Sequence, residues 1–318
     1  MRKNGPRAFW ISFFLTLAIL MPLLGGFVFY SAWQERASEP AAQPQSGVPV
    51  QRPAAANDLP VLVAVAAEEP AFLLVRLNAL EPAVTLCPVP AESVLLGPGG
   101  TVLLADSYTS AGPARAAQLL GATLNISIDR YLAITPGSLG QAWGELEPLR
   151  VNLTGLLEKS ELEALGLAGD PVVSLAPEEA TAFIASLGLP VAREARLRGE
   201  VWQAAFRQQL ENLPTALPAG LRSVIGSLLT DLTAADLYDL TDTLTWLAKE
   251  DAALTAETVP GRYDAQSGRY DFAQDSIAFA TRLFPAAEGS AATPAPSPSP
   301  APSDPLEPEA TVSPTRQP

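Results

Sequence analysis

The longest hydrophobic segment of the chain lies at its N-terminus. Residues 8–30 include no charged side chain, and this length exceeds the roughly 20 residues that a helix needs to cross a bilayer core. Three basic residues precede the segment and only Arg36 follows it closely, which places residues 1–7 in the cytoplasm and the rest of the chain outside. We therefore expect a single transmembrane helix over residues 8–30. A cleavable signal peptide is the alternative, because Ser31 and Ala32 follow the segment.

Two further segments lack the hydrophobic residues that a folded core requires. Residues 31–58 are mostly Pro, Ala, Gln and Ser, a composition typical of a spacer between a membrane and a domain. Residues 285–318 repeat Pro, Ala and Ser, as in Thr293–Pro300, and we expect a disordered tail with polyproline II character. The hydrophobic pattern thus confines the folded domain to residues 59–284.

Within this domain, patterns typical of strands alternate with patterns typical of helices. A continuous hydrophobic run of strand length occurs at residues 59–67, and further segments typical of strands occur at residues 72–75, 84–87 and 126–134. A Gln-Ser-Gly turn predicts a hairpin within residues 259–272. This alternation predicts an α/β fold with a central mixed sheet flanked by helices. The expected helices comprise residues 113–120, 137–146, 177–184, 198–210, 221–229 and 237–247.

Charge and composition exclude several classes of function. The net charge of −14 at pH 7 would repel nucleic-acid phosphates, so we expect no nucleic-acid partner. Because the chain has no histidine, Ser-His-Asp and Cys-His catalytic arrangements are impossible. The sequence contains neither a glycine-rich phosphate loop nor zinc-ligand spacing. The single cysteine, Cys87, lies in a hydrophobic strand, where we expect a buried side chain rather than a reactive thiol.

The order of these elements resembles the LytR-CpsA-Psr family of membrane-anchored transferases. Pro90-Ala91-Glu92 stands where a strand of that family ends in a Pro-Arg-Asp motif. Residues 128–131, Ile-Asp-Arg-Tyr, resemble an Ile-Asp-x-Tyr segment, and Glu68 and Glu69 follow the first strand, as an acidic cation ligand does in the family. The resemblance implies an enzyme that moves a phosphosugar from a polyprenyl pyrophosphate to a hydroxyl of the cell wall. It also implies that Glu92 is a metal ligand and that Mg²⁺ is the cofactor of an active member.

The arginines that grip the pyrophosphate in that family are largely missing here. Residues 185–187, Ala-Ser-Leu, stand at its Arg-x-Arg positions. Arg207, in the segment Arg-Gln-Gln, matches one arginine of a further family motif, and Ala204 replaces the other. Arg198 and Arg207 are thus the candidate contacts to a lipid phosphate. An ordinary solvated basic face of the helix is the alternative.

These features are compatible with three functions. The favoured one is a membrane-anchored, extracytoplasmic cell-envelope protein that keeps the family fold, has lost most phosphate-binding arginines, and acts as a binding or scaffolding module. Its partners would be a polyprenyl-linked glycan or proteins of cell-wall synthesis, besides the membrane that holds its N-terminal helix. The alternatives are an active glycopolymer transferase and an unrelated anchored structural protein. We assign no catalytic residue.

Overall fold

The structure is a computed structural model, and its described residues belong to one compact unit that begins at Arg52. The predicted transmembrane helix, most of the predicted spacer, and the tail beyond Pro285 lie outside these residues. Within the described ranges, no helix is long and apolar enough to cross a membrane. The described ranges are residues 52–54, 57–144, 146–164, 172–185 and 188–285.

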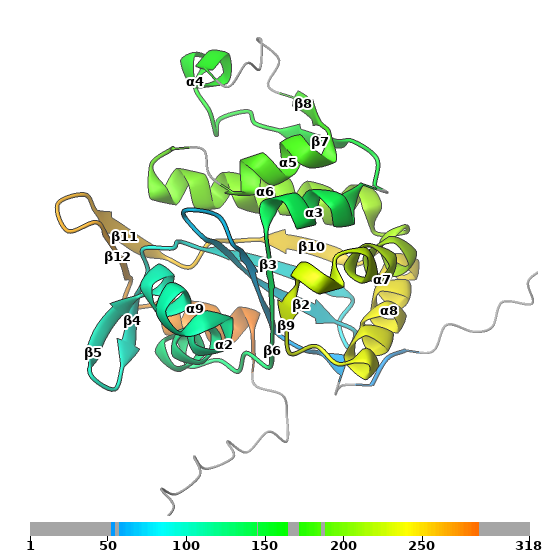
Figure 1. The fold of residues 1–318 in the computed structure, drawn as a ribbon, viewed down its shortest axis with the longest axis horizontal. Coiled ribbons are helices and arrows are strands. Elements are labelled where there is room, and N and C mark those ends of the chain that lie inside the picture. Colours follow the sequence, from blue (N-terminus) through cyan, green and yellow to red (C-terminus); the bar gives the residue numbers. More distant parts are fainter. Residues whose placement is uncertain (1–51, 55–56, 145, 165–171, 186–187, 286–318) are drawn as a thin grey trace, which may run out of the picture. The chain divides into compact units, whose positions relative to one another are not determined.

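Six strands form the central sheet, in the order β10-β3-β2-β1-β6-β9 (Figure 1). Strand β1 runs antiparallel to β2 and parallel to β6, which confirms the predicted mixed sheet. The parallel pairing needs a long crossover, and the chain makes it through β2, β3 and α2. The strands are β1 (Val61–Val65), β2 (Ala71–Asn78), β3 (Ala83–Val89), β6 (Arg130–Ile134), β9 (Leu229–Thr230) and β10 (Ala253–Ala256).

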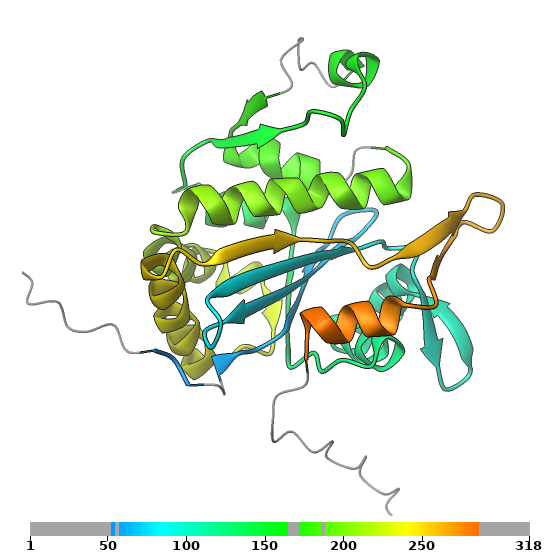
Figure 2. The same cartoon turned by 180° about the vertical axis from the view of Figure 1, so that it is seen from behind.

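Helices cover both faces of this sheet (Figures 1 and 2). Successive side chains of a strand point to opposite faces, so Leu62 and Ala64 join one hydrophobic core, whereas Val63 and Val65 join the other. Burial on both faces explains why β1 reads as a continuous hydrophobic run. The core of Leu62 is covered by α2 (Leu104–Leu124) and α9 (Ser276–Leu283), and that of Val63 by α3 (Pro136–Trp143), α5 (Pro177–Ala185), α6 (Val191–Gln209), α7 (Leu213–Ser223) and α8 (Ala234–Lys249).

Smaller elements surround this layered core. The described residues also form three two-stranded sheets. The sheet that pairs residues 261–264 with residues 269–272 confirms the hairpin predicted within residues 259–272. The three sheets are β4 (Val94–Gly97) with β5 (Gly100–Leu103), β7 (Leu149–Asn152) with β8 (Val172–Leu175), and β11 (Gly261–Asp264) with β12 (Arg269–Phe272), and the short helix α4 (Lys159–Ala164) precedes β8.

The helix predicted over residues 221–229 is wrong. Helix α7 ends at Ser223, and a 3-10 turn over Ile225–Ser227 leads into β9. Residues Leu229 and Thr230 pair with β6, so strand pairing determines the conformation of a segment whose hydrophobic spacing favours a helix. Leu221 and Val224 of this hydrophobic repeat are buried, whereas Ile225 and Leu229 are exposed, so the repeat does not mark the buried face of one helix.

Helix α2 is longer than predicted. The sequence places its start at Pro113, but the structure starts it at Leu104. Gly112 adopts a φ of 80°, a conformation that glycine tolerates without strain. This residue kinks the helix, and Pro113 then begins its second half, where a missing N–H costs little.

Cys87 is fully buried in β3, as the hydrophobic pattern predicts. Burial raises the pKa of its thiol to about 12. Because only the thiolate is alkylated, we expect the folded protein at pH 8 to react with iodoacetamide roughly a thousandfold more slowly than the chain in guanidinium. Mass spectrometry of the alkylated protein over time measures this ratio. Equal rates in the two conditions would contradict a buried thiol.

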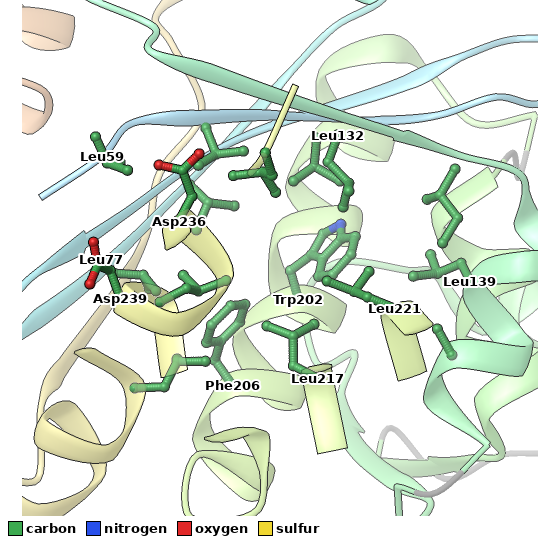
Figure 3. A pocket seen from close by; sticks show the side chains of 18 of the residues that line it. Leu59, Leu77, Leu132, Leu139, Trp202, Phe206, Leu217, Leu221, Asp236 and Asp239 are labelled. Atoms are coloured by element: carbon green, nitrogen blue, oxygen red, sulfur yellow. The ribbon is translucent and has the colours of Figure 1, made fainter. Parts of the chain in front are cut away.

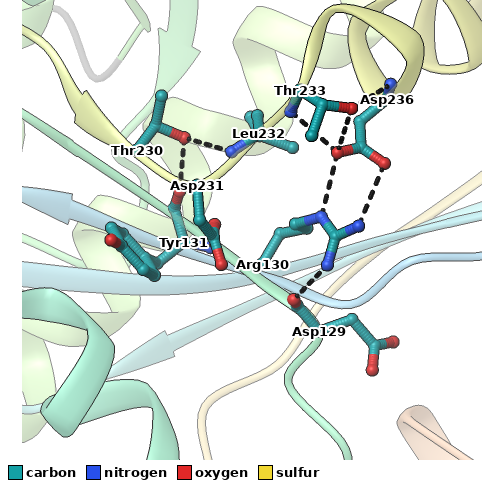
Figure 4. A network of polar contacts seen from close by, with 8 residues as sticks. All are labelled: Asp129, Arg130, Tyr131, Thr230, Asp231, Leu232, Thr233 and Asp236. Carbon is teal, nitrogen blue, oxygen red and sulfur yellow. Dashed lines mark hydrogen bonds and ion pairs between the residues drawn. The ribbon is translucent and has the colours of Figure 1, made fainter.

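A network of polar side chains joins the start of α8 to β6 (Figure 4). Thr233 and Asp236 form a capping box at the N-terminus of α8. Asp236 also accepts hydrogen bonds from Arg130, over 3.0 Å from Nε and 3.2 Å from Nη2. Asp231 accepts a hydrogen bond of 2.8 Å from the backbone N–H of Tyr131. The network thus fixes the first turn of α8 against the sheet.

The Arg130–Asp236 pair predicts a pH-dependent stability. A hydrogen bond from Arg130 lowers the pKa of Asp236 to about 2. A lowered pKa means that folding favours the carboxylate, so this stabilisation is present above about pH 4 and is lost as the pH falls through about 2. Because Arg130 is 32% exposed, we expect Asp236→Asn to lower the free energy of unfolding by only about 1 kcal/mol at pH 7. Urea unfolding at several pH values should show this difference shrinking toward pH 2, and a constant difference would contradict the prediction.

Candidate functional site

The predicted site residue Glu92 lies in a polar pocket beyond the end of β3. Its backbone is held from two sides, because the N–H of Tyr270 donates to the Glu92 carbonyl and the N–H of Ala105 donates to the Ala91 carbonyl, each over 2.9 Å. Glu69, from the turn after β1, lines the same pocket. The structure therefore brings together the carboxylates of Glu69, which follows β1, and Glu92, which follows β3.

Helix α6 contributes an ion pair to this pocket. Arg198 and Glu194 both line it, are each 7% exposed, and lie one helical turn apart, so Nη2 of Arg198 donates to Oε1 of Glu194. The same Nη2 donates to the carbonyl of Ala185 over 2.9 Å, and the other carboxylate oxygen of Glu194 accepts from the N–H of Leu189 over 3.2 Å. The guanidinium that would meet an anionic ligand is thus already paired with a carboxylate of its own helix.

The charges in this pocket perturb each other. Burial raises the pKa of Glu92, and the nearby Arg198 opposes this shift only in part. Burial likewise lowers the pKa of Arg198, while the surrounding carboxylates raise it. Three carboxylates, those of Glu69, Glu92 and Glu194, face one guanidinium. With all groups ionised the pocket carries two excess negative charges, which disfavour a phosphate group.

Arg207, the second predicted phosphate contact, lies elsewhere. It comes nine residues after Arg198 on α6, which corresponds to about 13.5 Å along the axis and half a turn around it. Its side chain is exposed. The neighbouring Gln208 exchanges two hydrogen bonds with the backbone of Arg150, of 2.8 and 2.6 Å, so the Arg-Gln-Gln segment fastens α6 to β7. The structure does not bring Arg198 and Arg207 together.

A divalent cation does not fit this pocket. Within the part of the chain that the structure describes, no group of three or more Asp, Glu, His or Cys side chains could hold a metal ion. The guanidinium of Arg198 also lies near Glu92, where it would repel a cation. Glu92 as a metal ligand therefore stays a prediction without a supporting set of ligands.

A second, apolar pocket lies between the sheet and the helices α3, α6, α7 and α8 (Figure 3). Its floor consists of side chains from β1, β2 and β6 that point to the same face of the sheet. Trp143 of α3 and Trp202 of α6 contact each other edge to face, with 5.0 Å between their ring centroids. Both side chains form part of the pocket wall. The floor residues are Val61, Val63, Val75, Leu77, Leu132 and Ile134.

The two pockets are neighbours along α6. Arg198 lines the polar pocket, and Trp202 and Phe206 line the apolar one. These residues are spaced by four positions, so they lie on one stripe of the helix, with about 6 Å between successive residues. A polar site thus adjoins an apolar pocket, an arrangement suited to a molecule with a polar and a hydrocarbon part.

The sequence analysis missed two components of these pockets. Glu194 and Arg198 have the i,i+4 spacing of an intrahelical ion pair, a signal that was visible but does not show that the pair is buried. Asp236, besides capping α8, lines the apolar pocket with Asp239. Neither position in the pocket can be inferred without the helix packing.

Comparison with known proteins gives matches at the level of structure. No family model matches the sequence, and no curated protein matches it. A structure described as a transcription regulator from Eubacterium siraeum shares 15% sequence identity with this chain. The match covers 77% of this chain and 97% of that one, with a TM-score of 0.60. TagT of Bacillus subtilis shares 14% identity over 74% and 92% of the two chains, with a TM-score of 0.55. A structure of TagT bound to LIIa-WTA gives a TM-score of 0.57 at 14% identity, over 71% and 90%.

These likenesses agree with the sequence resemblance. At such identities these likenesses bear on the fold alone, and the match with TagT of Bacillus subtilis covers 92% of that chain. TagT is an enzyme of the LytR-CpsA-Psr family. The chain described here has the LytR-CpsA-Psr fold.

Proposed function

We propose that this chain is a membrane-anchored, extracytoplasmic cell-envelope protein that binds the hydrocarbon part of a lipid and does not transfer a phosphosugar. The observation that carries the proposal is the apolar pocket beside a polar pocket whose one guanidinium is paired internally. Transfer between phosphates needs positive groups that stabilise the charge of the transition state. Arg198 is the arginine that could serve, but it is already paired with Glu194. The carboxylates of Glu69 and Glu92 line the same pocket.

The fold and the sequence together support the proposed ligand and location. The structure of TagT bound to LIIa-WTA supports a ligand of the cell envelope, and a polyprenyl-linked glycan or a protein of cell-wall synthesis remains the proposed partner. The hydrophobic residues 8–30 support a single membrane anchor with the domain outside the cytoplasm.

An active transferase is the second candidate. It is favoured by one observation, the presence of Glu92 and Arg198 in the same pocket, one helical turn from the apolar pocket. Supplying the full-length protein with a lipid-pyrophosphate-linked glycan and peptidoglycan tests it. We expect no transfer above the protein-free background, and transfer that Arg198→Ala abolishes would establish the enzyme instead. The likeness of fold disfavours the third hypothesis, an unrelated structural protein.

Lipid retention tests the proposed binding. Phe206 lines the apolar pocket and is half-buried, so Phe206→Gln places an amide in the pocket with less risk to folding than the loss of a core residue. We expect native mass spectrometry of the full-length protein in detergent to show co-purified lipid reduced about tenfold in this variant, because burial of an aromatic ring contributes about 1.5–3 kcal/mol. Arg207→Gln changes the adjacent exposed residue and should retain lipid at the wild-type level. Equal retention in both variants would contradict lipid binding in this pocket.

A further inference from the structure

The apolar pocket is polar at one end only. Its lining residues are hydrophobic except for Asn57, Asp236 and Asp239, which we call the acidic rim. Figure 3 shows both aspartates at the end that Leu59 and Leu77 line, away from Leu139. No Lys or Arg side chain lines the pocket. A ligand with its hydrocarbon part inside would therefore place a head group near carboxylates.

The rim lies at the opposite end of β1 from the polar pocket of Glu92. Arg130, which binds Asp236, pairs in register with Val61, the first residue of β1. Glu69 follows Val65, the last residue of β1. A five-residue strand spans about 16 Å. A head group at the acidic rim would thus occupy a place different from that of Glu92 and Arg198.

The charge at the rim is not balanced. Arg130 neutralises Asp236 through two hydrogen bonds, but Asp239, three residues later on α8, has no ion-pair partner among the described residues. An anionic head group would meet the uncompensated charge of Asp239, whereas a hydroxyl or an ammonium group could donate a hydrogen bond to it. We propose that the acidic rim selects an amphiphile whose head group donates hydrogen bonds and carries no negative charge, so that of the partners proposed above it excludes a glycan linked to a polyprenyl pyrophosphate at this rim. This inference rests on the lipid binding proposed above.

The size of the pocket limits the hydrocarbon part. The cavity has a volume of about 120 Å³, and an apolar cavity of about 150 Å³ in another protein holds one benzene molecule. The cavity in this conformation therefore encloses only about five carbons of a chain, so an octyl tail reaches from inside the cavity to the acidic rim. Octylamine, octanol and octyl phosphate are suitable probes, because they share one tail and differ in the head group.

Binding of these probes to the full-length protein in phosphatidylcholine nanodiscs tests the inference. Trp143 and Trp202 line the pocket, so tryptophan emission reports on occupancy once the other three tryptophans, Trp10, Trp33 and Trp246, are changed to Phe. We expect octylamine and octanol to bind about fivefold tighter than octyl phosphate. Asp239→Asn should weaken the binding of octylamine about threefold and strengthen the binding of octyl phosphate. Asp242→Asn removes the same charge from an exposed position of α8 that does not line the pocket, and should leave all three affinities unchanged.

The outcomes separate this inference from the proposed function. If octyl phosphate binds as tightly as the other probes, or if Asp239→Asn has no more effect than Asp242→Asn, the selection by the acidic rim is overturned while lipid binding stands. If no probe binds, as when another segment of this chain fills the pocket, both the inference and the proposed lipid binding are overturned.

Discussion

Replacing Glu194 with Ala is expected to destabilise the domain by about 2–3 kcal/mol. The change removes the carboxylate that is hydrogen-bonded to Arg198, and only the charges of Glu69 and Glu92 remain near a buried guanidinium whose Nε already has no hydrogen-bond partner among the described residues. It also removes the acceptor of the Leu189 N–H, so the turn before α6 loses its attachment. Urea unfolding of the full-length protein, followed by circular dichroism, measures the loss.

The pair Lys159–Glu163 is the matched control for this experiment. It has the same i,i+4 spacing on a helix, but its side chains are 81% and 62% exposed and 3.9 Å apart. Glu163→Ala should cost no more than about 0.5 kcal/mol, because solvent screens an exposed pair. A loss of the same size in both variants would show that the pair at Arg198 is not buried as described.

A double substitution separates the buried charge from general damage to α6. Replacing Glu194 and Arg198 together with Met removes both charges while keeping apolar volume. Such replacements of buried pairs are commonly neutral or stabilising, so we expect the double variant to recover most of the stability that Glu194→Ala loses. If it is as unstable as the single variant, packing of the side chain stems accounts for the effect instead of the unpaired guanidinium.

The layered architecture could be predicted because buried strands carry an unambiguous pattern. Residues 61–65 and 71–78 are hydrophobic at nearly every position, and burial of both faces leaves few other structures for such runs. The capping box of Thr233 and Asp236 likewise depends only on local sequence. The pairing of residues 229–230 with β6 is not local. Hydrophobic spacing therefore predicted a helix where the sheet imposes a strand.

The candidate site was less predictable for a related reason. Glu92 could be located from the Pro-Ala-Glu segment, because the turn after a strand is a local feature. Arg198 and Arg207 were predicted to share a phosphate site, but whether they do depends on which stripe of α6 faces the pocket, and both arginines lie on the same amphipathic helix. Sequence matching favoured the Arg-Gln-Gln segment, whereas packing places Arg198 at the pocket. Motif letters alone could not reveal that the ion pair of Glu194 and Arg198 is buried in this pocket.

Replacing Gly220 with Val is the second large effect that we expect, at about 3 kcal/mol or more. Gly220 lies where α7 meets α3, and a Cβ atom there would come within 2.3 Å of the carbonyl oxygen of Ala142. That oxygen belongs to a helix backbone, so the overlap cannot be relieved by a change of rotamer. The two helices would have to move apart.

This separation would also change the apolar pocket, because Trp143 of α3 and Leu217 of α7 both line it. We therefore expect Gly220→Val to lower both the midpoint of urea unfolding and the amount of co-purified lipid. Gly226→Val is the matched control, since a Cβ atom at Gly226 would meet nothing within 4 Å. If both variants have the same unfolding midpoint, close contact between α3 and α7 does not stabilise the domain. If Gly220→Val unfolds early yet retains lipid at the wild-type level, the lipid is bound somewhere other than the pocket between these helices.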